Sequence, residues 1–265
     1  MKLETATSIF DCLRIATEIA ISWGDEHSDP TLDIWYRGVN DNYDLLPSAY
    51  WNSKAEEYSS FLTFTQLARN ITETSGFNVW DYYCLARHHG IPTRLLDWSE
   101  GLTQSIFFAF DGWDGTTTPC IWIVRPDKIN QVSVNLDAIL LPNDFSESGR
   151  AASIWLPELK SKTAEYDGET WTNEKPIAIF PGRSNARVIG QLGTFTLHGT
   201  DSRPLNTILE SESECEKFLA RIDMVGLDPK ETKRNLHYLG LRQSSIYPDA
   251  DHVARDIGYM YGWGE

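Results

Sequence analysis

The sequence predicts an α+β fold in a single domain. Short β-branched and aromatic runs, such as IWYRGV at 34–39, alternate with longer stretches in which apolar residues recur at helical spacing. With 265 residues, 41% of them hydrophobic, the chain can bury a core that needs neither disulfides nor a metal. No internal repeat or low-complexity linker divides it. We therefore expect one domain over 1–265, with a small mixed or antiparallel β core surrounded by helices and a mainly helical C-terminal part.

The periodicity assigns the elements in order. An N-terminal helix at 4–22 lies within a leading segment 1–29, and the expected strands and helices follow a loop at 24–31. Strands are expected at 32–40, 93–98, 119–126, 175–182 and 190–199, and helices at 53–74, 79–89, 101–112, 213–227, 228–241 and 247–260. Ser99 or Glu100 is the expected N-cap at 101, Asp228 precedes Pro229, and Asp249 or Asp251 caps the last helix. Residues 127–175 read as loops and short strands.

The net charge and the spacing of the cysteines limit which binding partners and which cellular compartment we expect. A net charge of −15 opposes non-specific binding to nucleic acid, which depends on neutralising phosphates. The four cysteines are far apart and lack zinc-site spacing, so they predict free thiols in a reducing, cytoplasmic setting. No stretch approaches the length of an apolar membrane span, so we expect no membrane association.

Arg37 is a candidate ligand-binding residue because it sits in an apolar, aromatic strand. Buried arginines need a partner, and two partners fit. One is a core carboxylate such as Asp97; the other is an anionic ligand, whose carboxylate or phosphate a guanidinium binds through two parallel hydrogen bonds. Gly38 removes a side chain, which allows close approach of a ligand or of another backbone.

His88 and His89 end a predicted helix before a Gly90–Pro92 turn. They could cap the helix carbonyls, or one could donate to a substrate or act as a general acid or base. Adjacent helical residues point about 100° apart, so both face one site only if the helix ends there. A metal would need a third ligand, for which Asp97 is the one suggestion, and no metal site is predicted.

Asp97 follows Leu95 and Leu96, so we expect it to be at least partly buried and to need a cation. The candidate cations are Arg37, Arg87 and Arg94. An Asp–Arg pair that locks the turn to the strand of Arg37 is the favoured interpretation.

Four segments together resemble the FRG domain, a family named for a Phe/Tyr-Arg-Gly motif. They are WYRG (35–38), LARHHGIPTRLLDWSEGLTQSIFFA (85–109), QLGTFTLHG (191–199) and LGLRQSSIYPDADHVARDI (239–257). The resemblance spans residues 30–258.

The order of the same segments resembles, less closely, ADP-ribosyltransferases of the Arg-Ser-Glu type, whose core the fold would share. That resemblance implies NAD as the substrate nucleotide. It implies catalytic or ribose-contacting roles for Arg37, His88, Asp97 and Gln191. The residues it implies for binding NAD are Tyr36, Gly38, His89, Thr93, Arg94, Trp98, Ser99 and His198.

The implied function is an NAD-dependent ADP-ribosyltransferase or NAD glycohydrolase that acts on a macromolecular target as a toxin or an anti-phage defence component. One departure stands out: Gln191 and His198 occupy the region where those enzymes carry a catalytic glutamate. The alternative is a non-catalytic protein-interaction module in which the motif residues form a structural lock.

Overall fold

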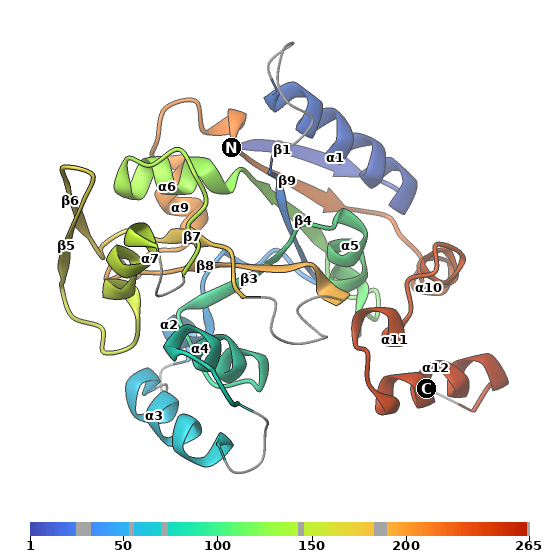
Figure 1. Ribbon diagram of the computed structural model, residues 1–265. Helices are drawn as coiled ribbons and strands as arrows, with labels where there is room; N and C mark the ends of the chain where they lie inside the picture. The colour runs from blue at the N-terminus through green and yellow to red at the C-terminus, as the bar shows by residue number, and fades with distance from the viewer. Residues whose placement is uncertain (25–32, 53–55, 70–73, 143–145, 183–189, 264–265) are drawn as a thin grey trace.

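A computed structural model describes residues 1–24, 33–52, 56–69, 74–142, 146–182 and 190–263. Its centre is a mixed seven-stranded sheet with the order β1-β9-β4-β2-β3-β8-β7 (Figure 1). The strands are β1 Lys2–Ala6, β2 Trp35–Val39, β3 Leu95–Ser99, β4 Cys120–Val124, β7 Ile177–Ile179, β8 Gly193–Leu197 and β9 Leu219–Met224. A separate hairpin joins β5 Thr163–Tyr166 to β6 Glu169–Thr172. The α+β prediction is confirmed.

Helices cover both faces of the sheet. They are α1 Ile9–Trp23, α2 Ser48–Trp51, α3 Glu57–Ala68, α4 Val79–His88, α5 Leu102–Phe110, α6 Pro126–Val134, α7 Glu147–Ala152, α9 Leu205–Glu210, α10 Pro229–Tyr238, α11 Gln243–Ile246 and α12 Ala250–Tyr261. Two single turns of 3₁₀ helix lie at Ser153–Trp155 and Cys215–Lys217. One face carries α1 and α5 over the β1-β9-β4 end and α4 and α7 over the β3-β8-β7 end. The opposite face packs on α6 and α9.

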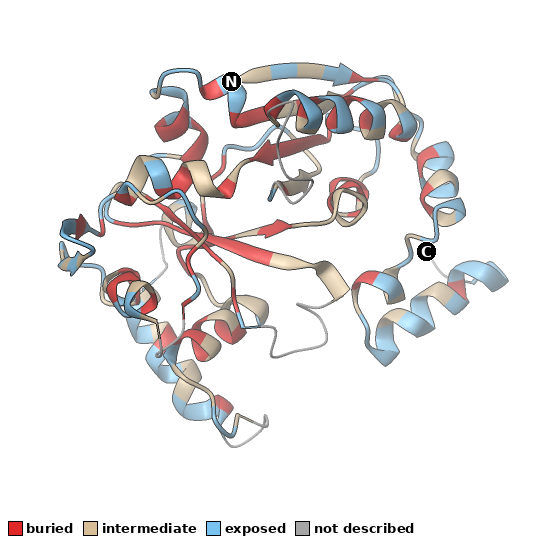
Figure 2. Ribbon diagram, turned by 45° about the horizontal axis from the view of Figure 1, so that its top comes forward, coloured by how far each residue is buried: buried red, intermediate tan, exposed pale blue. Residues whose placement is uncertain are grey.

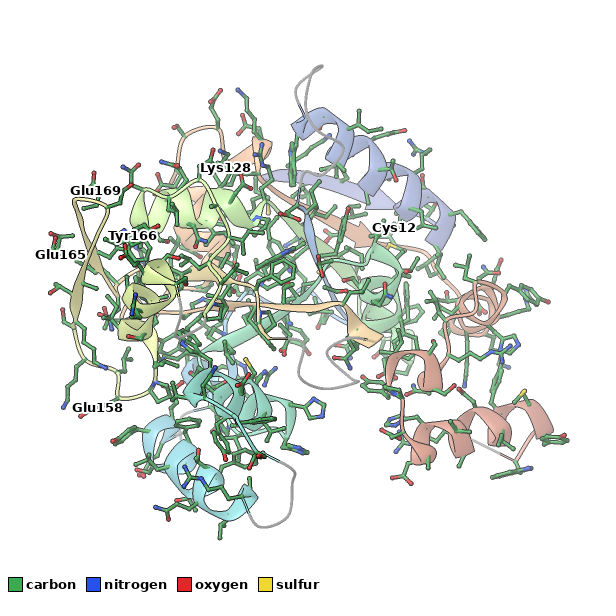
Figure 3. The ribbon with its side chains drawn as sticks, in the orientation of Figure 1. Cys12, Lys128, Glu158, Glu165, Tyr166 and Glu169 are labelled. Atoms are coloured by element: carbon green, nitrogen blue, oxygen red, sulfur yellow. The ribbon has the colours of Figure 1, made fainter. Side chains whose placement is uncertain are left out.

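Burial follows this layering. Strand β4 is buried along its length and β3 and β8 along most of theirs, whereas α12 is exposed on most of its surface (Figure 2). The β5–β6 hairpin extends from the body with Glu165 and Glu169 pointing into solvent (Figure 3). Cys12, on α1, is fully buried, and burial raises the pKa of its thiol to about 12. None of the helices in the described segments is long and apolar enough to cross a membrane.

Two predictions at the β1–β9 edge were wrong. Part of the helix predicted at 4–22 is instead β1, which pairs in parallel with β9, and the helix proper starts at Ile9. The helix predicted at 213–227 is mainly β9. Its alternation of buried Ala220, Ile222 and Met224 with the half-exposed Arg221 and Asp223 is a period-two pattern that places one side against α1.

Some of the helix-capping predictions are confirmed, and one was wrong. Asp228 and Asp249 cap α10 and α12, accepting from the backbone N–H of Glu231 and His252. The cap predicted at Ser99 or Glu100 was wrong, since Gly101 holds the N-cap position of α5 without a side-chain bond. The predicted irregular stretch at 127–175 contains α6 and α7 besides its short strands, and the loop at 24–31 falls mostly outside the described residues.

Gly38 sits on β2 because α5 crosses the strand at backbone distance. A Cβ built there would lie 1.7 Å from the Ser105 carbonyl oxygen and 2.7 Å from the Ala109 backbone nitrogen. Both are main-chain atoms of α5, which cannot rotate away. Of the two interpretations of this glycine, close approach of another backbone is the one that the structure shows.

Gly38→Ala should therefore destabilise the fold by about 3 kcal/mol, the cost of overpacking against a rigid neighbour. Gly190→Ala is the matched control, because a Cβ there meets its nearest atom at 3.7 Å. Urea unfolding of the two variants measures the difference. Equal stabilities would contradict the close approach of β2 and α5.

Candidate functional site

The candidate site lies where β2 and β3 separate. These neighbours pair at one position, Tyr36 opposite Ser99, whereas β2 pairs with β4 and β3 pairs with β8 along five positions each. A continued ladder would bring Gly38 opposite Asp97. Instead the strands diverge, and a cavity of about 580 Å³ opens between them. The helical layer is interrupted at the same place, since α4 and α5 line opposite walls of the cavity.

Arg37 bridges the diverging strands. Its Nη1 donates to the main-chain oxygen of Asp97 at 2.7 Å, the group that a continued ladder would place opposite Gly38. The same nitrogen lies 3.8 Å from the Asp97 carboxylate. Within the described chain this is the one hydrogen bond of the Arg37 guanidinium, and its side chain, 24% exposed, lines the cavity. Burial and the neighbouring Arg87 lower the pKa of Arg37, but an arginine stays protonated.

The main partner of Asp97 is Arg87, from the last turn of α4. Arg87 Nη2 lies 2.5 Å and Nε 3.0 Å from Oδ2 of Asp97, so two donors of one guanidinium bind the same carboxylate. Despite the cost of burial, the two arginines hold the pKa of Asp97 below its usual range. The expected lock between Asp97 and the strand of Arg37 is present only as a 3.8 Å ion pair, and Arg87 of α4 is the main partner of Asp97.

The charges that line the cavity sum to a positive value. Among the residues that the structure describes, Arg37 and Arg87 are the cations of the cavity lining and Asp97 is its one carboxylate. In a chain with a net charge of −15, this is a local site for an anion. Aromatic rings complete the walls, contributed by Tyr36, Tyr43, Phe108, Phe195 and Tyr247.

Ser99 and Gln191 also meet at the cavity. The Ser99 hydroxyl donates to the Gln191 main-chain oxygen at 2.7 Å, and the Glu100 N–H donates to the Leu192 main-chain oxygen at 3.0 Å. Leu192 has φ +48°, a left-handed conformation that is costly for a leucine. Two bonds from the end of β3 therefore hold the turn before β8 and bring Gln191 to the cavity wall.

Three residues expected to bind the nucleotide are instead part of the packed interior. Thr93, Arg94 and His198 have 0%, 1% and 0% of their surface exposed, and none of them lines the cavity. Arg94 donates through Nε to Glu57 at 2.7 Å, Nη1 to the His198 main-chain oxygen at 2.6 Å, and Nη2 to the Trp155 main-chain oxygen at 2.5 Å. It pairs with Glu57, so it is no partner of Asp97.

Trp98, His88 and His89 do not all line the same cavity. Trp98 contributes to the cavity lining, but its ring is buried, and its Nε1 donates to the Thr196 hydroxyl at 3.1 Å on the face opposite α4 and α5. His88 lines the cavity, whereas His89 faces a separate pocket beside α3, with Phe64 6.0 Å from its ring centre. The described residues hold no group of three His, Cys, Asp or Glu side chains placed to bind a metal.

Sequence reasoning missed several wall residues. Tyr43, Phe108 and Tyr247 were not singled out, although Tyr247 lies within the fourth motif segment. Aromatic residues are frequent throughout this chain, so the residue type did not indicate which of them line the cavity. Only the tertiary structure shows that the C-terminal segment returns to the cavity.

Arg94→Lys should cost about 3–5 kcal/mol of unfolding free energy, nearly as much as Arg94→Ala. One ammonium does not reproduce the three divergent hydrogen bonds of the guanidinium, and Glu57 is left without a matched partner. Denaturant unfolding of both variants measures the loss. A Lys variant as stable as the original chain would show that Arg94 is not a structural centre.

The stability of the fold should decrease as the pH falls below about 6.5. Burial lowers the pKa of His198 to about 3, so between these values the unfolded chain takes up a proton that the folded chain does not. The unfolding free energy is complete above pH 6.5 and is lost on acidification, by about 3 kcal/mol at pH 4. His198→Gln should remove this part of the slope. Identical pH dependence in the two proteins would refute the assignment.

A comparison with protein-family models matches residues 33–116 to the FRG domain. The match runs from the start of β2 past the end of α5 and contains Arg37, Arg87 and Asp97. A search of curated proteins produced no match, and neither did a search of solved structures. The comparison therefore identifies an FRG domain within the chain, over residues 33–116.

Proposed function

We propose that the cavity between β2 and β3 binds NAD or a related nucleotide with a pyrophosphate group, and that the chain acts as an ADP-ribosyltransferase-like effector. The observation that carries the proposal is the guanidinium of Arg37, held at the cavity with one donor engaged. Within the described residues its other N–H groups have no hydrogen-bond partner, so they can bind phosphate oxygens.

The size and lining of the cavity support this ligand class. A volume of about 580 Å³ lies within the range of small-molecule and cofactor sites. Arg37 and Arg87 supply positive charge, and the rings of Tyr36, Tyr43 and Tyr247 offer surfaces for a flat base. The residues present therefore fit a dinucleotide, which combines an anionic centre with aromatic ends.

Chemistry at bound NAD would break the bond between ribose and nicotinamide, with the leaving group taking the electron pair. The positive charge that develops on the ribose needs a negative or polar group beside it. Asp97 is the one carboxylate lining the cavity within the described residues, and Gln191 offers an amide. We assign Asp97 the electrostatic role and Gln191 the ribose contact, with transfer to a macromolecular target as the activity of a toxin or defence protein.

One observation favours the alternative, an interaction module without catalysis. The short contacts between Arg87 and Asp97 tie α4 to β3, which is what a structural lock requires. The two functions require different arginines: the structural lock depends on Arg87, and nucleotide binding depends on Arg37.

Arg37→Ala should weaken NAD binding about 30-fold, since losing a charge-assisted contact costs about 2 kcal/mol. Isothermal titration calorimetry with NAD and with ADP-ribose measures this. Arg125→Ala is the matched control: Arg125 has similar exposure, donates to a main-chain oxygen and faces Asp127. It should bind as the original chain does.

The same variants separate the alternatives by their melting temperatures. Under the nucleotide proposal, Arg37→Ala lowers stability less than Arg87→Ala does, because only the second change takes from Asp97 its main partner. Absence of NAD binding to the unaltered chain, together with a large loss of stability in Arg37→Ala, would favour the interaction module.

A further inference from the structure

A second cavity, of about 630 Å³, lies between the end of α5 and the C-terminal helices. Figure 1 shows α10, α11 and α12 together at one side of the molecule, next to α5. Four exposed cations line this α10–α12 groove: Lys230 and Lys233 from α10, Arg242 just before α11, and Arg255 from α12.

These cations lack acidic partners. Within the described segments, none of the four forms a salt bridge with a carboxylate. Some cations elsewhere on the surface are paired, as Lys128 with Asp137 and Arg203 with Asp201, whereas Arg234 has no salt bridge within the described segments either. With 38 acidic and 23 basic residues, the chain has carboxylates in excess, so an uncompensated cluster of cations is a local departure from its overall charge.

The two carboxylates in the groove do not neutralise it. Asp111 accepts from Gln243 Nε2 at 2.7 Å and from the Tyr247 hydroxyl at 3.2 Å. Asp256 accepts the backbone N–H groups of Gln243 and Ser244 at 3.2 and 2.9 Å. Both carboxylates accept from uncharged donors that anchor α11. They offset only part of the charge of the four exposed cations, so the lining of the groove stays positive.

The floor of the groove is apolar and aromatic. Phe107, Phe110 and Trp113 from the α5 region lie opposite Leu236 of α10. Tyr259 of α12 is 42% exposed, and the Lys233 ammonium stands 4.5 Å from its ring centre. The groove thus combines a place for an apolar side chain with a rim for acidic ones.

We propose that the α10–α12 groove binds an acidic segment of a partner protein, with carboxylates on its four cations and an apolar or aromatic residue on its floor. Charge complementarity selects this occupant. A nucleic acid would extend its phosphates beyond the groove onto a strongly acidic protein, whereas a peptide can confine its charge to the rim. This proposal stands apart from nucleotide binding and holds with or without it.

The groove adjoins the cavity between β2 and β3. Tyr247 lines that cavity, while its hydroxyl donates to Asp111 in the wall of the groove. Phe107 and Phe108, adjacent on α5, likewise line one site each. A partner segment in the groove would therefore lie directly beside the candidate nucleotide site.

Fluorescence anisotropy with labelled poly(Glu,Tyr), a random copolymer of glutamate and tyrosine, tests the proposal. The full chain should bind it more tightly than poly(Glu), which lacks the aromatic anchor. Lys233→Glu with Arg255→Glu should weaken binding at least about tenfold, and added salt should do the same. Arg234→Glu is the matched control, an exposed cation of α10 that does not line the groove, and it should bind within about twofold of the original chain.

Several outcomes would overturn the proposal. One is a loss in Arg234→Glu equal to that of the double variant, which would mean diffuse charge attraction. Another is tighter binding of single-stranded oligo(dT) that depends on the same two cations, which would assign the groove to nucleic acid. Absence of poly(Glu,Tyr) binding at low salt, with all variants melting at the original temperature, would also refute it.

Discussion

The separation of β2 from β3 is the constraint on which the candidate site depends. Seven strands could form a continuous sheet, but these two pair only at Tyr36 and Ser99. A strand that leaves its neighbour exposes main-chain groups that need new partners. Arg37 supplies one by donating to the Asp97 main-chain oxygen. The structure thus places a guanidinium at the opening in its own sheet, where a ligand can also reach it.

Two other contacts hold the opening in place. Gly38 lets α5 rest on the β2 backbone, which fixes one wall. The Arg87–Asp97 pair ties α4 to β3, which fixes the opposite wall. Below them, the buried Arg94 joins α3, β3 and the strand end at His198 through one side chain. Residues 33–116, which match the FRG domain, therefore contain a ligand candidate, a lock and a structural centre, each of which depends on an arginine.

The distinction among these arginines is a matter of surroundings. Arg94 makes its hydrogen bonds to groups inside the protein. Arg87 donates mainly to one carboxylate, that of Asp97. Arg37 engages one donor within the described chain. Where the partners are complete the residue stabilises the fold, and where they are incomplete it has capacity left for an anion. The same reasoning separates the four cations of the α10–α12 groove from paired surface cations such as Lys128 and Arg203.

The sequence by itself determined the α+β class, the strand of Arg37, helix α4, the cap at Asp228 and the FRG resemblance, and it narrowed the last cap to Asp249 or Asp251. These features depend on local periodicity and motif spacing. It misjudged β1 and β9, whose pairing is made across more than two hundred residues and is absent from any local window. Tertiary structure alone decided that Arg87 holds Asp97, that Thr93, Arg94 and His198 are buried, and that Tyr247 reaches the cavity. Partner choice and burial depend on which elements pack together, and a one-dimensional pattern does not contain that information.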